Sequence, residues 1–510
     1  MPQRLPATNM AILITPRRHA FIRWALVTHL QNNNMATAKQ NFYKWHRIMG
    51  LTALIPVIFW TISGLSHPFM SNWFRPTIAQ EVFKPLPQSQ IKPTLSIHQV
   101  LDKNGITEFR NFGLINFNKQ SYYQILGKDS ITNYYSAANG EVLKNGDRLY
   151  AVYLARYFTQ DSTSKIKAIS LQKIFDGHYQ PINHLLPVWK VSFDRPDGMD
   201  IYVETGQSRM GTFNNNTRKA MLSLFEQLHT WAFLAAIGGE QFRIIVLLII
   251  VSILFLSLLS GLTVYGFFWK KFKTATQNRK GSGKKDTRFV HRFHRQIGLI
   301  VSFVMFTFVT SGAFHLLVKL HNIGPKQKVY GQVFDINDLV LSNLKLPLAD
   351  SVITKVGLVK LDGQTYYQAS NNSKDILYFD AKTGTELNDG DRQYARFLSE
   401  YYRGSKTTRD LKVTQIRQFD NEYGFINKRL PVQKVEYPNA ENWYIETTTS
   451  QLSTKVAGID RTEGFSFIFL HKYFGMTWAG KNIRDIVSML AALGVLVVSL
   501  FGFAAFIKNK

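Results

Sequence analysis

The amino-acid sequence predicts an α+β membrane protein with four transmembrane helices in two tandem repeats, each repeat enclosing one extracytoplasmic α+β domain. Three observations predict this fold class. Four apolar stretches are each long enough to cross a bilayer. The long segments that follow the first and third stretches match each other in sequence. Both segments alternate short Tyr-, Ile- and Val-rich runs with glycine-containing turns, a pattern typical of antiparallel sheet.

The composition of the 510-residue chain narrows the chemistry that it can carry. Lys and Arg outnumber Asp and Glu by 61 to 34, which gives a net charge of +27. Such a basic balance fits nucleic-acid binding or the cationic loops of a membrane protein, and the apolar stretches favour the membrane. We therefore expect membrane lipid, and no nucleic acid, as a partner. The absence of cysteine excludes disulfides, thiolate-bound iron–sulfur clusters and covalent c-type haem attachment.

The N-terminal segment, residues 1–41, is predicted to be an extension that is disordered or translated from the wrong start. Its apolar stretch is interrupted by Pro16 and Arg18 and has no small-residue cleavage site. It is therefore neither a spanning helix nor a typical signal peptide. Met35 opens a basic lead-in of the usual kind, and we interpret it as the natural start.

The first and third apolar stretches, residues 45–67 and 293–315, share a pattern of histidine and glycine. In each, two histidines are 21 residues apart. On an α-helix this spacing places both imidazoles on similar faces, roughly 31 Å apart along the axis, close to the thickness of the hydrocarbon core. Gly50 and Gly298 each follow the first histidine by one turn, and we expect them to leave flat, empty space beside it for a large planar ligand.

The chain divides into eight predicted segments. They are the extension (1–41), the first transmembrane helix (42–70), the first outer domain (71–228), the second helix with its preceding histidine (229–270), a basic loop (271–290), the third helix (291–320), the second outer domain (321–470) and the fourth helix with its preceding histidine (471–510). The cationic loop and the lysines beside the first and fourth helices predict cytoplasmic termini and outer domains that lie outside.

The two outer segments are predicted to be copies of each other. The sequence YYSAANGEVLKNGDRLYA at 134–151 matches YFDAKTGTELNDGDRQYA at 378–395. The sequence FDGHYQPINHLLPVWKV at 175–191 matches FDNEYGFINKRLPVQKV at 419–435. Because both helix pairs enter their repeat with the same topology, the expected pseudo-two-fold axis runs along the membrane normal.

Each copy is expected to have one main helix after a Gly-Asp-Arg sequence. In the first copy this helix carries a tyrosine face that includes Tyr150, which we expect in the domain core. Arg148 and Arg392 follow the aspartates Asp147 and Asp391. We interpret each arginine as the partner of its preceding aspartate, in preference to a role in binding an anionic chelate.

These motifs resemble the PepSY-associated transmembrane helix family, over residues 42–508. The family has a W/F-H-R-x-x-G-L opening helix, which occurs at 45–51 and 293–299, and a Leu-His pair before the next helix, which occurs at 228–229 and 470–471. The resemblance implies PepSY-like outer domains in a bacterial inner-membrane protein. Some relatives are reductases that hold haem b on histidines and reduce ferric siderophores, whereas many are known only as iron-regulated membrane proteins.

Six histidines fall into three matched pairs, and we predict that they bind haem iron, because bis-histidine ligation suits haem and facing helices build such sites. The pairs are His46 and His294 at the cytoplasmic ends, His67 and His315 at the outer ends, and His229 and His471 before the second and fourth helices. Two haem b groups are expected. The inner one needs both cytoplasmic histidines, while the outer four suffice for one or two haems. The alternative is that all six are interfacial residues at the headgroup level.

Four further residues are assigned to the expected haem sites. Arg243 and Arg484 stand at the outer ends of their helices and are predicted to pair with haem propionates by charge-assisted hydrogen bonds. The alternative for both is snorkelling into the headgroups. Gly261 and Gly502, each 18 residues further on, are predicted to clear room for the inner haem.

Two functions follow from the sequence. The leading one is a transmembrane electron-transfer protein that reduces a ferric chelate, a siderophore in the resemblance, on the extracytoplasmic side during iron uptake. Since no flavin or nicotinamide motif occurs, quinol or a separate partner is the expected electron donor. No catalytic residue is assigned. The alternative is a non-catalytic PepSY membrane protein that binds a peptide, a protease or a metal chelate.

Neutralising the basic loop tests the predicted topology. Replacing Lys270, Lys271, Lys273, Lys284 and Lys285 with Gln removes charges that favour a cytoplasmic loop. We therefore expect a lower yield of inserted protein and an inverted fraction, measured with reporter fusions at the C-terminus. Correctly inserted protein should keep any cofactor spectrum. Loss of the spectrum in that fraction would assign the loop to ligand or partner binding instead.

Overall fold

The computed structural model describes residues 37–79, 93–271, 273–274, 289–323, 328–339, 353–371 and 375–508. Met35, the rest of the chain before residue 37 and nearly all of the predicted basic loop lie outside these residues. The chain separates into two compact units. The helical unit contains the chain up to residue 65, 242–317 and the chain from 470, and the α+β unit contains 66–241 and 318–469.

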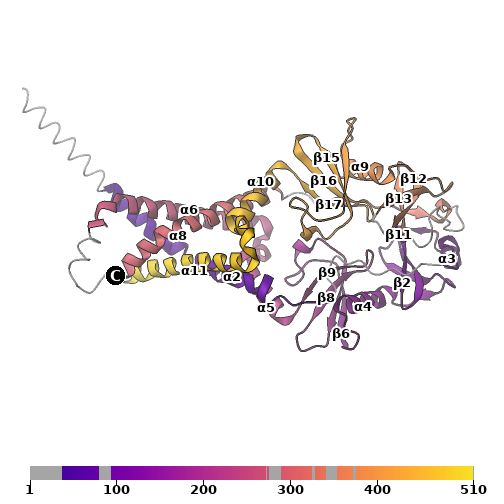
Figure 1. The fold of residues 1–510 in the computed structure, drawn as a ribbon, viewed down its shortest axis with the longest axis horizontal. Coiled ribbons are helices and arrows are strands. Elements are labelled where there is room, and N and C mark those ends of the chain that lie inside the picture. The colour runs from indigo at the N-terminus through magenta and orange to yellow at the C-terminus, as the bar shows by residue number, and fades with distance from the viewer. Residues whose placement is uncertain are drawn as a thin grey trace, which may run out of the picture. The chain divides into compact units, whose positions relative to one another are not determined.

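Four helices among the described residues are long and apolar enough to cross a membrane, as the sequence predicts. They are formed by residues 37–52 with α2 (Leu54–Pro68) and the π-helical turn η1 (Phe69–Trp73), by α6 (Ala232–Phe267), by α8 (Phe289–His321) and by α11 (Gly480–Ile507). The four lie together as a bundle (Figure 1). Gly239 breaks α6 near its start, because its φ of +81° is a left-handed value that glycine adopts without strain.

Small residues bring the helices of this bundle into close contact. A Cβ atom on Gly50 would lie 3.8 Å from Oγ of Ser257, and one on Gly298 would lie 3.7 Å from Cγ1 of Val498. Both are ordinary van der Waals distances, so each glycine keeps room for a methyl group although a neighbouring helix is close. The binding of a large planar ligand beside Gly50 and Gly298 stays a prediction.

The α+β unit has two lobes, and every strand pairing in it is antiparallel, as predicted. Lobe 1 (residues 93–225) carries two four-stranded sheets. The first sheet consists of β2 (Asn111–Phe117), β3 (Gln120–Leu126), β4 (Thr132–Ser136) and β5 (Val142–Leu143). The second consists of β6 (Ile166–Gln172), β7 (Val188–Phe193), β8 (Asp200–Glu204) and β9 (Arg209–Asn214). The helices of lobe 1 are α3 (Ile97–Lys103), α4 (Gly146–Thr159) and α5 (Asn216–Phe225).

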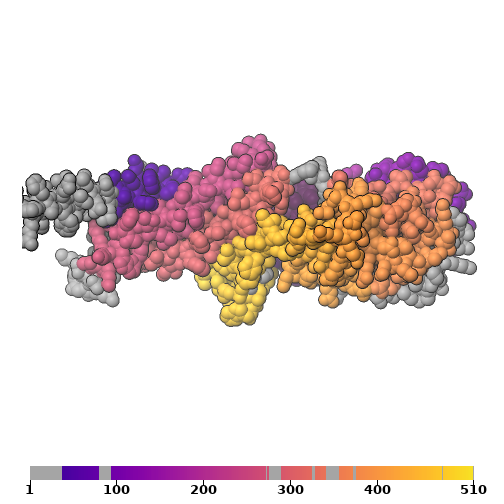
Figure 2. All heavy atoms as spheres, turned by 90° about the horizontal axis from the view of Figure 1, so that it is seen from above, coloured from indigo at the N-terminus to yellow at the C-terminus, as the bar shows by residue number. Residues whose placement is uncertain are grey.

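In the described residues of lobe 2 (328–466), a three-stranded sheet, a helix, a four-stranded sheet and a final helix follow one another in sequence, an order similar to that of lobe 1. The first consists of β11 (Ile353–Leu361), β12 (Gln364–Asn371) and β13 (Ile376–Asp380), and the second of β14 (Lys412–Ile416), β15 (Val432–Tyr437), β16 (Glu441–Glu446) and β17 (Gln451–Val456). Its helices are α9 (Gly390–Arg403) and α10 (Gly458–Ser466). The short strands β1 (Glu108–Phe109) and β10 (Phe334–Asp335) pair across the lobes. In the space-filling view, orange residues of lobe 2 cover most of the visible face of this unit, with purple residues of lobe 1 along one edge (Figure 2).

Aligned residues of the two lobes make the same hydrogen bonds at the start of the main helix. In lobe 1 the Tyr134 hydroxyl donates to Asp147 Oδ1 over 2.9 Å, and in lobe 2 the Tyr378 hydroxyl donates to Asp391 Oδ1 over 2.9 Å. A Cβ atom on Gly146 would lie 2.5 Å from the Tyr134 Cβ atom, so only glycine fits at the start of α4. The Gly-Asp pair therefore seats the helix against the sheet.

These contacts correct the predicted arginine ion pairs. Asp147 also accepts a hydrogen bond from Trp189 Nε1 over 2.6 Å, and among the described residues Arg148 makes no ion pair. Arg392 pairs at 3.7 Å with Asp389 rather than with the preceding aspartate. The reason is helical geometry, because successive side chains diverge by about 100°, so an aspartate that points into the core leaves the next arginine on the surface.

The two lobes share one hydrophobic core. Phe112 of β2 and Tyr367 of β12 meet edge to face, with ring centroids 6.5 Å apart. Tyr150 of α4 is 1% exposed, which confirms that the tyrosine face of this helix includes a core residue. The short helix α3 begins at a capping box between Ser96 and Gln99. Residues of β2 and β11 contribute to the shared core, and each lobe has a further core of its own, to which Tyr150 belongs in lobe 1.

Glu446 joins the lobes through a buried ion cluster. Glu446 is only 2% exposed. Its carboxylate forms an ion pair with Arg209 of lobe 1 at 2.6 Å and another with Arg429 of lobe 2. Arg209 also pairs with Glu204 of its own lobe. Burial alone would raise the pKa of Glu446, but the two guanidinium groups hold that pKa well below its usual range.

Substitution of Glu446 with Gln should destabilise the α+β unit, because it leaves Arg429 buried without a carboxylate; breaking such a pair costs about 3–5 kcal/mol. We expect a lower melting midpoint of the purified protein at pH 7. The pKa of Glu446 is about 4.5 in the unfolded chain and is lower in the folded protein. The carboxylate therefore stabilises the fold at pH values above 4.5, and this stabilisation is lost as the pH falls toward the pKa of the folded state. The difference between wild type and variant should therefore shrink as the pH falls below about 4.

The control is Glu436→Gln, which removes a carboxylate paired with Lys412 and Lys434 on the lobe surface. Exposed pairs contribute about 0–1 kcal/mol, so this variant should melt close to wild type. Equal loss in the two variants would show that Glu446 is not a special link between the lobes.

Candidate functional site

The cytoplasmic pair of predicted ligands comes together in the helical unit. The imidazole rings of His46 and His294 have centroids 6.2 Å apart and planes inclined at 39°. His46 belongs to the helical residues 37–52 and His294 to the first turns of α8, so residues 248 positions apart meet across the bundle. The structure thus brings together the pair that the sequence assigned to an inner haem.

Each of these histidines is oriented by the main chain of a neighbouring helix. His46 Nδ1 lies 3.0 Å from the carbonyl oxygen of Ser257 in α6, and His294 Nδ1 lies 2.9 Å from that of Val498 in α11. A carbonyl oxygen only accepts hydrogen bonds, so Nδ1 carries the proton in both rings and Nε2 keeps its lone pair. Histidines that bind metals are held in this way, with the second ring nitrogen donating to a carbonyl.

Glycines on the same two helices accommodate the imidazoles. A Cβ atom on Gly261 would lie 2.8 Å from Cε1 of His46, and one on Gly502 would lie 2.9 Å from Cε1 of His294. Such distances are too short for any side chain. Gly261 and Gly502 were predicted to clear room for the haem itself, and the structure corrects this, because the histidine rings occupy the space.

The inner pair has the dimensions that bis-histidine ligation requires. Two imidazoles whose Nε2 atoms each lie about 2 Å from one iron have centroids about 6 Å apart. The observed 6.2 Å separation fits this value. Among the described residues no group of three or more His, Asp or Glu side chains could hold a metal ion, so pairs of histidines are the candidate ligand sets.

In the α+β unit, His67 and His229 contact the same phenylalanine. The Phe225 ring stacks on His229 with centroids 4.5 Å apart, and it lies 5.6 Å from His67. His229 belongs to the π-helical turn η3 (Glu226–Thr230), and turns of this kind are common at functional sites. His67 and His229, which the sequence assigns to the outer haem site, therefore share one aromatic neighbour.

In the helical unit, Ser311 lies beside a second predicted pair of outer ligands, His315 and His471. His471 belongs to the π-helical turn η7 (Phe467–His471), and its Nδ1 lies 3.2 Å from Oγ of Ser311. His315 follows Ser311 by four residues on α8 and so projects from the same helix face. The Phe308 ring lies 5.1 Å from His471. His471 thus contacts Ser311 and Phe308, and His315 lies one helical turn from Ser311.

The two predicted propionate partners differ in burial. Arg243 is only 8% exposed and is packed against protein, which argues against free snorkelling into headgroups. Arg484 is half-buried, so it is less enclosed by protein than Arg243.

The sequence revealed all six histidines but missed the atoms that orient them. The acceptors at Ser257 and Val498 are main-chain carbonyls, which every residue possesses, so no residue type marks them. The sequence does contain one indication of these contacts. Gly261 and Gly502 each follow the acceptor residue by one helical turn, and a glycine within a helix indicates that another group approaches closely there.

Two comparisons with known proteins gave no match. No protein-family model matches the chain. No curated protein matches its sequence at a significant level. The fold and the site therefore define the class on their own, as a bundle of four apolar helices with paired histidines, joined in sequence to a two-lobed α+β unit.

Adding a methyl group at Gly261 or Gly502 tests the site. In Gly261→Ala and Gly502→Ala the new Cβ would collide with an imidazole, so we expect haem per protein, measured as pyridine haemochrome, to fall by at least half. Alanine favours helix by about 1 kcal/mol over glycine, so a loss would not reflect a weaker helix.

Gly266→Ala on α6 and Gly312→Ala on α8 are the matched controls, since a Cβ at either position has no neighbour within 4 Å. Both controls should keep the haem content of wild type. Unchanged haem in Gly261→Ala would contradict the placement of His46 as a ligand.

Proposed function

We propose that the protein is a haem-binding electron-transfer protein of the bacterial inner membrane, and that it reduces a ferric chelate such as a siderophore on the extracytoplasmic side during iron uptake. One observation carries the proposal. His46 and His294 face each other at 6.2 Å with each Nδ1 hydrogen-bonded to a carbonyl, which leaves two Nε2 lone pairs for one iron.

The proposed topology has two tandem repeats with cytoplasmic termini and two PepSY-like lobes outside. The matched hydrogen bonds of Tyr134 and Tyr378 support the duplication. The equivalent contacts of His46 and His294 with helices α6 and α11 extend it to the bundle. The excess of basic residues between the second and third apolar helices supports the orientation.

The histidines have distinct proposed roles at the two membrane faces. His46 and His294, one from each repeat, would hold one haem b near the cytoplasmic face. The pairs His67 with His229 and His315 with His471 would hold haem near the outer face, and Arg243 and Arg484 would neutralise propionates. Bound haem supplies a reversible one-electron carrier, whose potential depends on axial ligands and burial.

Partner proteins or lipids supply what the chain lacks. With no flavin or nicotinamide motif in the sequence, quinol or a separate protein is the proposed donor. The acceptor is a ferric chelate in the extracytoplasmic space. We assign no catalytic residue, because an outer-sphere electron transfer needs proximity and a matched potential rather than a reacting side chain.

A second candidate function is a non-catalytic PepSY-like membrane protein that binds a peptide, a protease or a metal chelate. A cleft of about 860 Å³ in the α+β unit favours it, since this volume suits a ligand without any redox chemistry. The two functions differ in one observable. A pyridine haemochrome assay on protein expressed with ample iron and haem precursor detects haem in the first case and none in the second.

Single histidine substitutions separate the two proposed haem positions. His46→Ala and His294→Ala should each remove the same inner haem, because each removes one of its two axial ligands. Alanine at His67, His229, His315 or His471 should reduce outer haem and spare the inner one. Haemochrome content and low-temperature absorption spectra measure the loss, and reduction of an external ferric chelate in oriented vesicles should stop in every case.

His98→Ala and His321→Ala serve as controls, since neither residue has a counterpart in the other copy. Both should retain haem and activity. Full reductase activity after His46→Ala would contradict electron entry from the cytoplasmic side, and a haem-free wild type would overturn the proposal altogether.

A further inference from the structure

The α+β unit contains a cleft where its two lobes meet. It encloses about 860 Å³, within the range of small-molecule sites. Its lining includes Gly113 of β2 and Gly357 of β11, and a Cβ atom on Gly357 would lie 3.4 Å from the Phe112 carbonyl oxygen of β2, so the two strands approach closely here. The turns between β8 and β9 and between β16 and β17 contribute Gln207 and Thr449 to its walls.

On the lobe 1 side of this cleft, three cations have no ion-pair partner among the described residues. Lys144, Arg148 and Lys173 line it and are exposed, and among the described residues they make no hydrogen bond or ion pair. The cleft also has three carboxylates, but Glu204 is already neutralised by Arg209. Together with Lys355 the lining therefore carries an excess of positive charge.

Lys355 lies at the junction of the lobes and adds a half-buried ammonium group. Its Nζ donates to the Gly206 carbonyl over 3.1 Å and to Gln207 Oε1, both uncharged acceptors. Burial lowers the pKa of Lys355 to about 8. The nearby carboxylates Glu446 and Glu204 partly offset this effect of burial, but each is itself paired with arginine, and an anion bound beside Lys355 would stabilise its charge further.

Lobe 2 provides an internal comparison, because its aligned positions lack free cations. Asn388 replaces Lys144, Arg392 pairs with Asp389 at 3.7 Å, and Arg417 pairs with Asp375. None of these residues lines the cleft. The aligned cations are therefore paired with aspartates in lobe 2, whereas in lobe 1 they have no ion-pair partner and surround a cavity.

The remaining wall of the cleft is apolar and partly open to solvent. Leu171 is 41% exposed, Val142 is 51% exposed and Ile131 is 57% exposed. Trp189 completes this side. Apolar surface with a few convergent charges is the usual composition of a small-ligand site.

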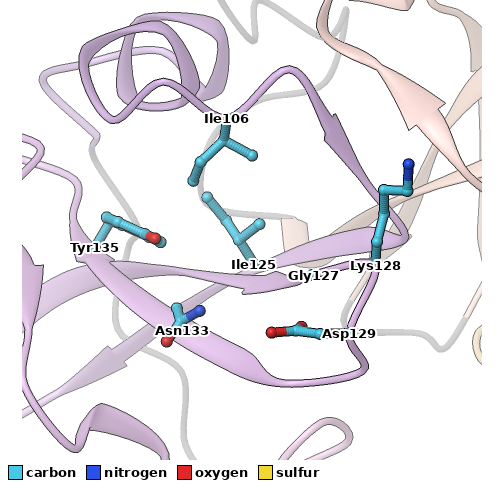
Figure 3. Close-up of a pocket in the computed structure, with 7 residues that line it drawn as sticks. All are labelled: Ile106, Ile125, Gly127, Lys128, Asp129, Asn133 and Tyr135. Atoms are coloured by element: carbon cyan, nitrogen blue, oxygen red, sulfur yellow. The ribbon is translucent and has the colours of Figure 1, made fainter.

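A second, smaller hollow is a weaker candidate. It encloses about 310 Å³ and is lined by Ile106, Ile125, Gly127, Lys128, Asp129, Asn133 and Tyr135 (Figure 3). Its charged groups already have partners. Lys128 pairs with Glu108 at 2.6 Å, and Asp129 accepts a hydrogen bond from the Ile131 amide over 2.9 Å.

We propose that the cleft between the lobes binds a small organic anion that combines several carboxylate-type groups with an apolar body, with Lys355, Arg148, Lys144 and Lys173 as its anionic recognition groups. Binding at this site requires no haem. Anion binding in this cleft can therefore be tested separately from electron transfer.

Calorimetric titration of the purified full-length protein with benzene-1,3,5-tricarboxylate tests the proposal, because this probe presents three carboxylates on an apolar ring. The neutral isostere benzene-1,3,5-tricarboxamide is the ligand control. We expect the tricarboxylate to bind at a stoichiometry of one, with affinity that falls as salt rises, and the tricarboxamide to bind at least about tenfold more weakly.

Arg148→Gln and Lys173→Gln should each weaken tricarboxylate binding by about tenfold, the usual effect of losing one charge-assisted contact. Lys355→Met should weaken it further. The matched control is Arg392→Gln, which alters the aligned arginine of lobe 2 and should bind as wild type. Because Arg148 and Lys173 are exposed, their variants should fold normally, as melting curves would verify.

Three results would overturn the proposal. They are the absence of tricarboxylate binding by folded wild-type protein at millimolar concentration, equal binding of the neutral isostere, and an equal effect of Arg148→Gln and Arg392→Gln. A hexaglutamate peptide that binds where the tricarboxylate does not would likewise replace the small anion by an acidic peptide.

Discussion

The hydrogen bond from a histidine Nδ1 to a main-chain carbonyl of the adjacent helix is the constraint on which the candidate site depends. It occurs twice, at His46 with Ser257 and at His294 with Val498. Inside an apolar bundle a donor without a partner is costly, so the bond holds each ring in one tautomer and one orientation. The glycine one turn beyond each carbonyl is a consequence, because the ring occupies the volume of a side chain.

The two lobes of the α+β unit share one hydrogen-bonded framework but differ in the charges around it. The framework itself is preserved in the tyrosine–aspartate bonds that seat α4 and α9 on their sheets. Charges around it differ. Lobe 2 pairs Arg417 with Asp375, while lobe 1 leaves the aligned Lys173 free beside a cleft. Glu446 then joins the lobes with a buried cluster, so the cleft has walls in a defined position.

Much of the fold could be predicted from the local sequence pattern. The predictions that proved wrong have a common physical cause. The apolar stretches, the glycine turns and the tyrosine core face depend on neighbouring residues, and the structure confirms them. The ion pair expected between Asp147 and Arg148 and the space for haem expected at Gly261 were wrong. Both depended on what another element brings to the same place, namely Trp189 in the first case and the His46 ring in the second.

The sequence by itself determined the four apolar helices, the antiparallel α+β character and the set of six matched histidines, because hydropathy and period are written along the chain. Only the tertiary structure decided which histidines meet, which carbonyls orient them and where unpaired cations surround a cavity. These features join residues as far apart as His46 and His294, or Gly113 and Gly357. Main-chain acceptors and empty space have no residue code, so they appear only when helices and sheets are packed together.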